Sequence, residues 1–285
     1  MAAQQVTHEE MIVEYAALAS IQANVNTTMA GSDWIERANN PEADVEANRI
    51  PLDYHTAALI ECYELSIAAT AYKWWAPPKL DRNGAVMELV DILHFALSQL
   101  IADSYASDAN PDTLEIEAVN TSIAEEILEA WDDASADTDA EDFDGDSIPV
   151  VRESDVGSLV MLNSACQSLT SALLEDGFDY EFWSAFWIVA QLLDVNPTVV
   201  AGLYRAKAEL NRFRTRNGGV QGTYVKRWTF RDADSLTGEL VTREDNAWLF
   251  DYVKQSQKPL TEGELATWLA ERYNSRVVVP QRLDA

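Results

Sequence analysis

The sequence predicts an all-α protein, and three observations support this fold class. Apolar residues recur at spacings of three and four through most of the 285-residue chain, whereas the strict alternation of a strand is rare. A capping box formed by Thr7 and Glu10 is expected to begin a first helix that runs to about Met29. Nine Trp, ten Tyr and eight Phe, within 47% hydrophobic residues, provide enough apolar surface for a folded core.

Seven further helices follow from the same periodicity. A second helix, strongly apolar, is predicted over residues 55–72, and a third over residues 85–102, with a loop around Pro77 and Pro78 between them. The remaining helices are expected over residues 113–131, 155–175, 179–192, 197–213 and 261–273.

One domain is expected over residues 1–285, because the chain shows no internal repeat and no Gly/Ser-rich linker. It would carry an acidic low-complexity insertion at about 132–150 and a C-terminal extension after about 258. The insertion is interpreted as a solvated loop. A calcium-binding EF-hand loop does not fit there, because Asp142 stands where glycine is needed and Ile148 where the bidentate glutamate is needed.

The net charge of −28 is the strongest compositional signal, and only six of the 20 basic residues are Lys. Such a surface is typical of adaptation to high salt, where self-repulsion is screened, so a halophilic source is expected; an acidic protein of an ordinary cytosol is the alternative. The charge argues against a nucleic-acid partner, because phosphate backbones would be repelled.

Cysteine usage and the apolar stretches indicate a cytoplasmic protein. Cys62 and Cys166 both lie in apolar helical context, where buried free thiols are expected in a reducing compartment. The start, MAAQQVTHEE, lacks the basic and apolar regions of a signal peptide. No uncharged apolar stretch reaches about 18 residues, so no membrane association is expected.

Two carboxylate pairs interrupt the second and third predicted helices. Glu61 and Glu64 are the only charges in the second, and Glu88 and Asp91 the only charges in the third. A spacing of three residues places each pair on one helical face. An exposed acidic stripe is the alternative, but it would continue with polar residues, and the positions one turn away are mostly apolar.

Buried carboxylates need compensation, because desolvating one costs several kcal/mol. They can protonate, pair with arginine or bind cations. Neither predicted helix contains an arginine. Hard oxygen ligands suit Mg²⁺ or Mn²⁺, and facing carboxylates on bundle helices are a recurrent metal site, so a metal centre is predicted.

A basic segment could provide the counterpart for phosphate. Residues 204–231 contain eight of the 20 basic residues. Lys207, Asn211 and Arg214 recur on one helix face, and a glycine-rich turn and Lys226 follow. Cations together with backbone N–H groups of the turn would form a triphosphate cradle. The alternative is a basic patch that pairs with the acidic surface.

Amide side chains on the first helix are candidates for nucleobase recognition. Gln22 and Asn26 lie on or beside its apolar stripe, and an amide both donates and accepts hydrogen bonds. Trp74, Trp75 and His94 could wall an aromatic slot. A satisfied core glutamine and plain packing of the tryptophans are the alternatives.

Six segments of the chain resemble the motifs of one known family. IQANVNTTMAGSDW resembles a uracil segment, IECYEL and MELVDILHF resemble ExxE and ExxD metal motifs, and KWW resembles an aromatic-lysine motif. KAELNRFRTRNGGVQGTYVKRW resembles a phosphate segment, and EDNAWL the acidic-Asn motif after it. Over roughly residues 15–250 the chain is therefore similar to the dimeric all-α dUTP pyrophosphatases (dUTPases).

The resemblance implies a helical bundle of the all-α NTP pyrophosphatase type, in which both subunits of a homodimer complete the site. It implies Mg²⁺-dependent hydrolysis of dUTP and dUDP to dUMP, with release of pyrophosphate or phosphate; Mn²⁺ is the alternative ion. The metal ligands would be Glu61, Glu64, Glu88 and Asp91, with Glu61 also activating water as the catalytic residue. Uracil and deoxyribose would contact Gln22, Asn26, Trp75, His94 and Asn211. Phosphates would contact Lys73, Lys207, Arg214, Asn217, Tyr224 and Lys226.

The chain departs from the family pattern near its aromatic-lysine motif. The run from Glu64 to Lys73 is one residue longer than expected, and Ser66 and Ile67 replace the usual Asp-Ser, which affects the placement of Lys73 and Trp75. Two other functions stay open: a pyrophosphatase of this fold with another base specificity, and a non-catalytic helical interaction protein.

Overall fold

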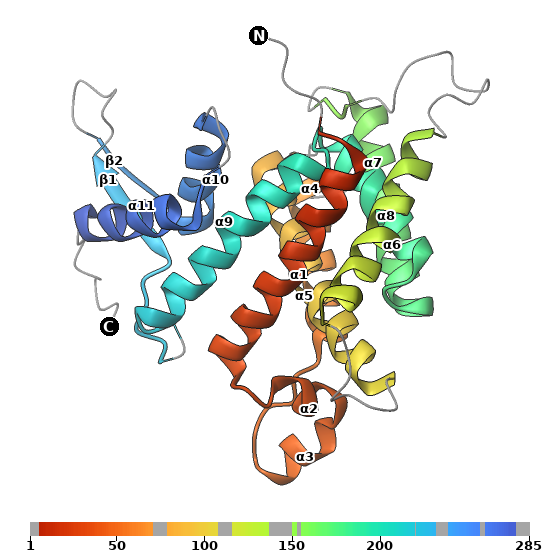
Figure 1. Cartoon of the computed structure of the whole chain (residues 1–285). Coiled ribbons are helices and arrows are strands. Elements are labelled where there is room, and N and C mark those ends of the chain that lie inside the picture. Colours follow the sequence, from red (N-terminus) through yellow and green to blue (C-terminus); the bar gives the residue numbers. More distant parts are fainter. Residues whose placement is uncertain are drawn as a thin grey trace. The chain divides into compact units, whose positions relative to one another are not determined.

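The computed structural model of the chain describes residues 6–70, 79–107, 116–136, 150–152, 155–219, 221–231, 239–256 and 260–277. These residues form eleven helices and one two-stranded antiparallel sheet (Figure 1). The helical content confirms the all-α prediction apart from that hairpin. The chain divides into two compact units, Met1–Tyr204 and Arg205–Ala285. One domain with an acidic insertion and a C-terminal extension stays a prediction.

The first unit is a bundle of long helices with two short ones. Helix α4 packs against α5 and α7, α1 packs against α6 and α5, and α8 packs against α6 and α7. The helices are α1 (His8–Ala30), α2 (Trp34–Asn39), α3 (Pro41–Glu46), α4 (Tyr54–Thr70), α5 (Arg82–Ser107), α6 (Ile116–Ala136), α7 (Val156–Asp176) and α8 (Tyr180–Leu192).

The long helices of this unit begin within three residues of their predicted starts. The capping box at the start of α1 is present, with the Glu10 N–H donating to Thr7 Oγ1 and the Thr7 N–H to the Glu10 carboxylate. Asp155 and Asp179 cap α7 and α8 through backbone N–H groups two and three residues later. The short helices α2 and α3 are not predicted, because six residues are too few to show a helical period.

Helix α5 forms the centre of the bundle. Arg82–Ala106 is long and apolar enough to cross a membrane, with a mean hydropathy of 1.6, but 72% of its most apolar stretch is buried inside the protein. That burial is typical of a core helix in a soluble protein. Two of its acidic residues, Glu88 and Asp91, are half-buried.

Both cysteines are buried and free, as the sequence predicts. Cys62 lies on α4 and Cys166 on α7, where these helices pack together. Burial raises the pKa of each thiol to about 12.

The second unit has its own apolar core. Helix α9 (Pro197–Arg216) begins in the first unit and ends in the second, and β1 (Arg227–Arg231), β2 (Leu240–Glu244), α10 (Asp245–Gln255) and α11 (Glu262–Ser275) follow. The two strands pair with Thr229 opposite Thr242. The core residues are Ala206, Leu210, Phe213, Trp228, Phe230, Leu249, Leu265 and Leu269.

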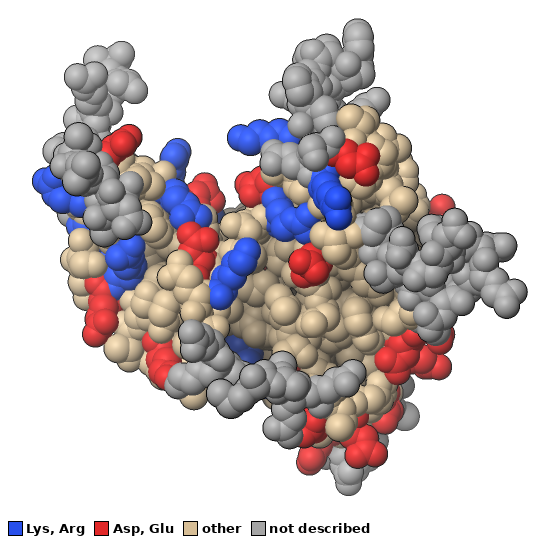
Figure 2. All heavy atoms as spheres, turned by 90° about the horizontal axis from the view of Figure 1, so that it is seen from above, with Lys and Arg blue, Asp and Glu red and all other residues tan. Residues whose placement is uncertain are grey.

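The two units differ sharply in charge. Residues 1–204 contain six basic and 37 acidic residues, a formal charge of −31, whereas residues 205–285 contain 14 basic and 11 acidic residues, a formal charge of +3. Figure 2 shows Lys and Arg side chains on the strand-bearing second unit. The net charge of −28 thus comes entirely from the first unit.

The charge of the first unit predicts a salt-dependent fold. Self-repulsion among its carboxylates should weaken in salt, so the melting temperature should rise as KCl is added from about 0.05 M to about 3 M. Calorimetry across this series measures the effect, and a flat melting temperature would contradict adaptation to high salt.

Candidate active site

Helices α4 and α5 bring three of the predicted metal ligands together. Glu61 on α4 and Glu88 and Asp91 on α5 are half-buried, and a carboxylate oxygen of each lies within 4.8 Å of those of the other two. Glu88 and Asp91 reach one point because they are separated by about one turn of α5. Glu61 joins them because α4 packs along α5.

The fourth predicted ligand, Glu64, has a different environment. It lies one turn after Glu61 on α4, but its side chain is exposed and it is outside the group of three. Its role as a metal ligand stays a prediction.

The donor set fits a hard divalent cation. Three ionised carboxylates at this spacing would repel one another by about 3 kcal/mol per pair at an effective dielectric constant of about 20. Carboxylate oxygens are the ligands that Mg²⁺ and Mn²⁺ prefer, and such an ion would relieve the repulsion.

A buried hydrogen-bond network surrounds Gln22 on α1. Its Oε1 accepts from the Tyr204 hydroxyl at 2.6 Å and contacts His94 Nδ1 at 2.7 Å. Its Nε2 donates to Asn26 Oδ1 at 2.8 Å and to Ser98 Oγ at 2.9 Å. The imidazole of His94 stacks on the Tyr204 ring with centroids 3.9 Å apart. The two amides and His94, predicted to contact uracil, therefore lie side by side.

The network distinguishes the two amides. Gln22 has all four of its hydrogen-bonding positions occupied by protein groups, whereas Asn26 uses Oδ1 once and donates once, to Ser98 Oγ at 3.0 Å. Among the described residues, Asn26 therefore retains one N–H and one acceptor position. Tyr204 was missed by the sequence analysis; its position three residues before Lys207 on one helix was the available signal.

In the second unit, the predicted phosphate contacts converge on the start of α10. The Asp245 carboxylate accepts from Arg214 Nε at 2.9 Å, from Arg214 Nη2 at 2.6 Å and from the Tyr224 hydroxyl at 2.9 Å. The Asn246 Oδ1 accepts from Lys207 Nζ at 3.2 Å and from Arg214 Nη2 at 2.9 Å. Three of the predicted phosphate residues thus belong to one network.

Other predicted residues of this segment lie around that network. Asn211 Oδ1 accepts from Arg214 Nη1 at 3.3 Å, and the exposed Asn217 bonds to the Phe213 carbonyl. Lys226 is exposed. Lys73 and Trp75, with the aromatic-lysine motif, lie outside the described residues, as does most of the acidic insertion.

Several N–H groups of the glycine-rich turn bond within the protein, and the phosphate cradle stays a prediction. The Gly219 N–H donates to the Arg214 carbonyl at 2.7 Å, and the N–H groups of Thr223 and Tyr224 donate to the Gly218 carbonyl. Gly218 has a φ of +93°, and a Cβ there would lie 1.9 Å from Thr223 Oγ1. These N–H groups therefore close the end of α9.

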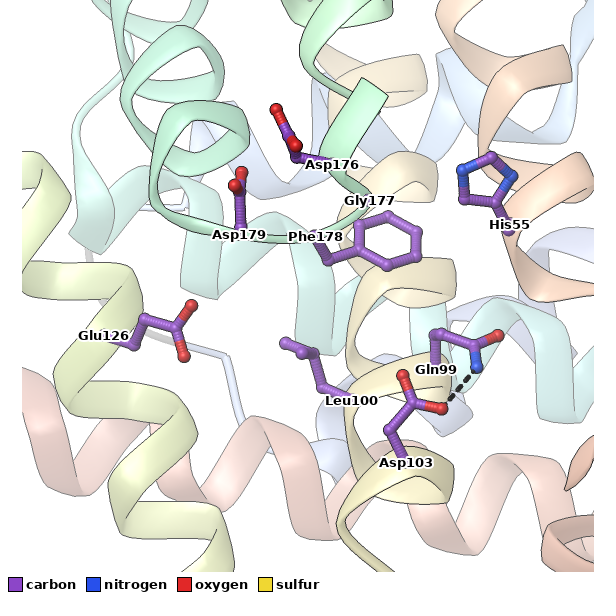
Figure 3. Close-up of a pocket in the computed structure, with 9 residues that line it drawn as sticks. All are labelled: His55, Gln99, Leu100, Asp103, Glu126, Asp176, Gly177, Phe178 and Asp179. Carbon is purple, nitrogen blue, oxygen red and sulfur yellow. Dashed lines mark hydrogen bonds between the residues drawn. The ribbon is translucent and has the colours of Figure 1, made fainter. Parts of the chain in front are cut away.

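A separate pocket of about 450 Å³ opens in the first unit (Figure 3). Four carboxylates line it, together with His55, Gln99, Leu100, Gly177 and Phe178; they are Asp103, Glu126, Asp176 and Asp179. None of these residues is a predicted site residue. An acidic lining repels a triphosphate, so this pocket does not suit a nucleotide.

The fold and the carboxylate group together define the class of this protein: a helical bundle in which neighbouring helices bring together carboxylates that could hold a divalent cation. A family model described as dUTPase matches residues 14–218, from α1 to the turn after α9. The chain therefore belongs to the dUTPase family, and it is an enzyme, a dUTP diphosphatase. No curated protein matches the chain.

The acidic pocket generates a pH prediction. Burial, and next the charge of Asp179, raises the pKa of Glu126 above its usual value of 4.5. A raised folded-state pKa means that ionised Glu126 destabilises the fold at neutral pH, and that this cost disappears as pH falls below the unfolded value. Glu126→Gln should therefore raise the melting temperature at pH 7, and the gain should vanish near pH 4.

Glu125→Gln is the matched control, because Glu125 is an exposed neighbour on the same helix. The Glu125→Gln substitution also removes one negative charge, but from a side chain that is exposed to solvent. Equal gains in both variants across the pH range would contradict the prediction.

Proposed function

We propose that this dUTP diphosphatase depends on Mg²⁺, that it converts dUTP to dUMP and pyrophosphate, and that it also converts dUDP to dUMP and phosphate. The observation that carries the proposal is the group of three carboxylates from α4 and α5, with oxygens within 4.8 Å of one another. It lies inside the segment matched by the family model.

The acidic residues would act in two ways. Glu61, Glu88 and Asp91 would hold the metal, with Glu64 as the predicted fourth ligand. The bound cation would neutralise phosphate charge and lower the pKa of a coordinated water. Glu61 would orient the attacking water and accept its proton.

The second unit would supply the cations for the phosphates. Lys207, Arg214 and Lys226, with Tyr224 and Asn217, are the proposed contacts there, and Lys73 is the proposed contact from the first unit. The formal charges of the two units support this assignment of the phosphate contacts. A triphosphate is repelled by the first unit, with its charge of −31, but not by the second, with its charge of +3. These cations would stabilise the negative charge that develops on the leaving group.

Base selection is proposed for the buried amide network. The imide edge of uracil presents an N–H between two carbonyl oxygens, and an amide with one N–H and one acceptor position can pair with it. Asn26 has these positions among the described residues, and Gln22 would orient it. His94, Asn211 and Trp75 are the further proposed contacts to uracil and deoxyribose.

A homodimer is proposed, with α4 and α7 as the contact face. Helix α4 has three large apolar side chains on its outer side, Ile60, Tyr63 and Ile67. Their exposed fractions lie between 50% and 67%. Helix α7 packs beside it, exposes Val160 and has no charged residue over residues 156–174. Glu64 is an exposed carboxylate on the same face of α4, but the rest of this surface is apolar or uncharged, so two acidic copies would repel one another less here than through their other surfaces.

The proposed setting is the cytoplasm of a salt-adapted cell or of a virus that infects one. Two free thiols and the acidic first unit support this proposal. The same charge supports the absence of nucleic-acid and membrane partners.

A turnover panel tests the reaction and its substrate. The purified protein is incubated with each deoxynucleoside triphosphate and with dUDP, with MgCl₂ or MnCl₂, at low and molar KCl. Preferred conversion of dUTP to dUMP and pyrophosphate is expected. Preference for dCTP or a damaged nucleotide would support the alternative of another base specificity, and no turnover would favour the non-catalytic alternative.

The metal assignment predicts opposite effects on activity and stability. Glu88→Gln or Asp91→Asn should abolish turnover but raise the melting temperature without metal, because repulsion within the group is relieved. The rise in melting temperature caused by Mg²⁺ should shrink in the same variants. Glu64→Gln tests whether the metal has three carboxylate ligands or four. Full activity of this variant would show that Glu64 is not a metal ligand. Full activity of Glu88→Gln and Asp91→Asn at saturating Mg²⁺ would contradict the assignment.

The amide network predicts a base-specific loss. Asn26→Ala or Gln22→Ala should weaken dUTP binding by roughly 1–3 kcal/mol, and inorganic triphosphate binding much less, because triphosphate has no base. Calorimetric titration of both ligands measures the difference. Equal losses for the two ligands would show that the amides are structural.

The dimer face predicts a concentration-dependent assembly. Tyr63→Asp should convert dimer into monomer, because it buries a charge opposite its own copy. Sedimentation equilibrium measures the mass. A monomeric wild-type protein, or a dimeric variant, would contradict this face.

A further inference from the structure

Asp245 has an environment unlike that of an ordinary residue at a helix start. It is the first residue of α10 and its side chain is fully buried. One carboxylate accepts four hydrogen bonds: two from Arg214, one from the Tyr224 hydroxyl and one from the Asn246 N–H at 2.9 Å. Its own N–H donates to the Lys226 carbonyl at 2.9 Å. Asp245 thus ties α9, the segment before β1 and α10 together.

The two-pronged contact fixes the direction of the arginine. Nε and Nη2 of Arg214 both bond to Asp245, so the guanidinium plane is set and its Nη1 edge points toward Asn211. A lysine could not be held this way, because an ammonium has no planar fork. Burial, and next the charge of Asp245, raises the pKa of Tyr224 well above its usual value, so its hydroxyl stays protonated and donates.

A second contact extends this arrangement to Lys207. Its side chain is buried, and its Nζ donates to the same Asn246 oxygen that accepts from Arg214. Asp245 and Asn246 together therefore join three of the residues that the proposed function assigns to the phosphates. A carboxylate among cations also reduces the repulsion that would otherwise separate Lys207 from Arg214.

We propose that Asp245 is a positioning residue, which holds Arg214 and Tyr224 in the orientation that binds the phosphates of the substrate. The inference rests on the proposed function of these residues as phosphate contacts. Asp245 lies beyond the segment matched by the family model, which ends at residue 218. It acts through Arg214 and touches no substrate itself.

Another ion pair of the second unit provides a matched control. Arg243 pairs with Asp251 at 2.5 Å, also within the hairpin and α10, but both side chains are about one-third exposed and neither contacts the network of Asp245 in the bonds described. Asp251→Asn therefore removes an arginine–aspartate pair without disturbing the proposed phosphate contacts.

The test uses the full-length protein with inorganic triphosphate and MgCl₂, measured by calorimetric titration. Asp245→Asn keeps the shape of the side chain but removes the charge that four donors share. It should lower the affinity for triphosphate at least about tenfold, whereas Asp251→Asn should leave it unchanged. The rise in melting temperature caused by Mg²⁺ alone should persist in Asp245→Asn, because the carboxylate group of α4 and α5 is intact.

A double-mutant cycle separates positioning from general stability. If Asp245 acts through Arg214 and Tyr224, Asp245→Asn combined with Arg214→Ala should lose less affinity for triphosphate than the sum of the two single losses. Fully additive losses of triphosphate affinity would overturn the inference. Unchanged triphosphate affinity of Asp245→Asn, or a wild-type protein that does not bind triphosphate, would overturn it as well. Where Asp245→Asn does not fold, Arg214→Lys serves instead, and wild-type affinity in that variant would also overturn it. Failure of the proposed function has a different signature: triphosphate binds as expected, but dUTP is not hydrolysed.

Discussion

The cost of placing carboxylates on apolar helices is the constraint on which the first unit depends. Glu61, Glu88 and Asp91 are half-buried and come from helices that also contribute to the core, so their charges are only partly solvated. A cation between them would offset this cost. The packing of α4 along α5 therefore supplies the geometry that such an ion would need.

The second unit differs from the first in that it brings several cationic side chains close together. Its hairpin and α10 bring one buried aspartate beneath Arg214 and, through Asn246, next to Lys207. The carboxylate group and the arginine cluster belong to separate units. In one core the two groups would neutralise each other. The charge difference along the chain, −31 and then +3, agrees with the proposal that the first unit would bind the metal and the second the phosphates.

Helical periodicity was enough to predict the long helices and the two carboxylate helices, because burial on one face leaves a pattern in sequence. It could not predict the hairpin, since Trp228, Thr229 and Phe230 are consecutive buried residues and show no alternation. Nor could it predict the partners of Asp245 and Gln22, because Arg214 and Tyr204 lie 31 and 182 residues away from them along the chain. An acidic residue at a helix start is ordinarily explained by the helix dipole alone.

The two buried thiols have a chemical consequence for an enzyme of this kind. Cys62 is next to Glu61 in sequence, and a reactive sulfur there would compete as a metal ligand and would be open to oxidation. With a pKa of about 12, only about one thiol in 10⁵ is ionised at pH 7. The enzyme should therefore tolerate air, alkylating reagents and the absence of reductant, and its two cysteines should react with thiol probes only after unfolding.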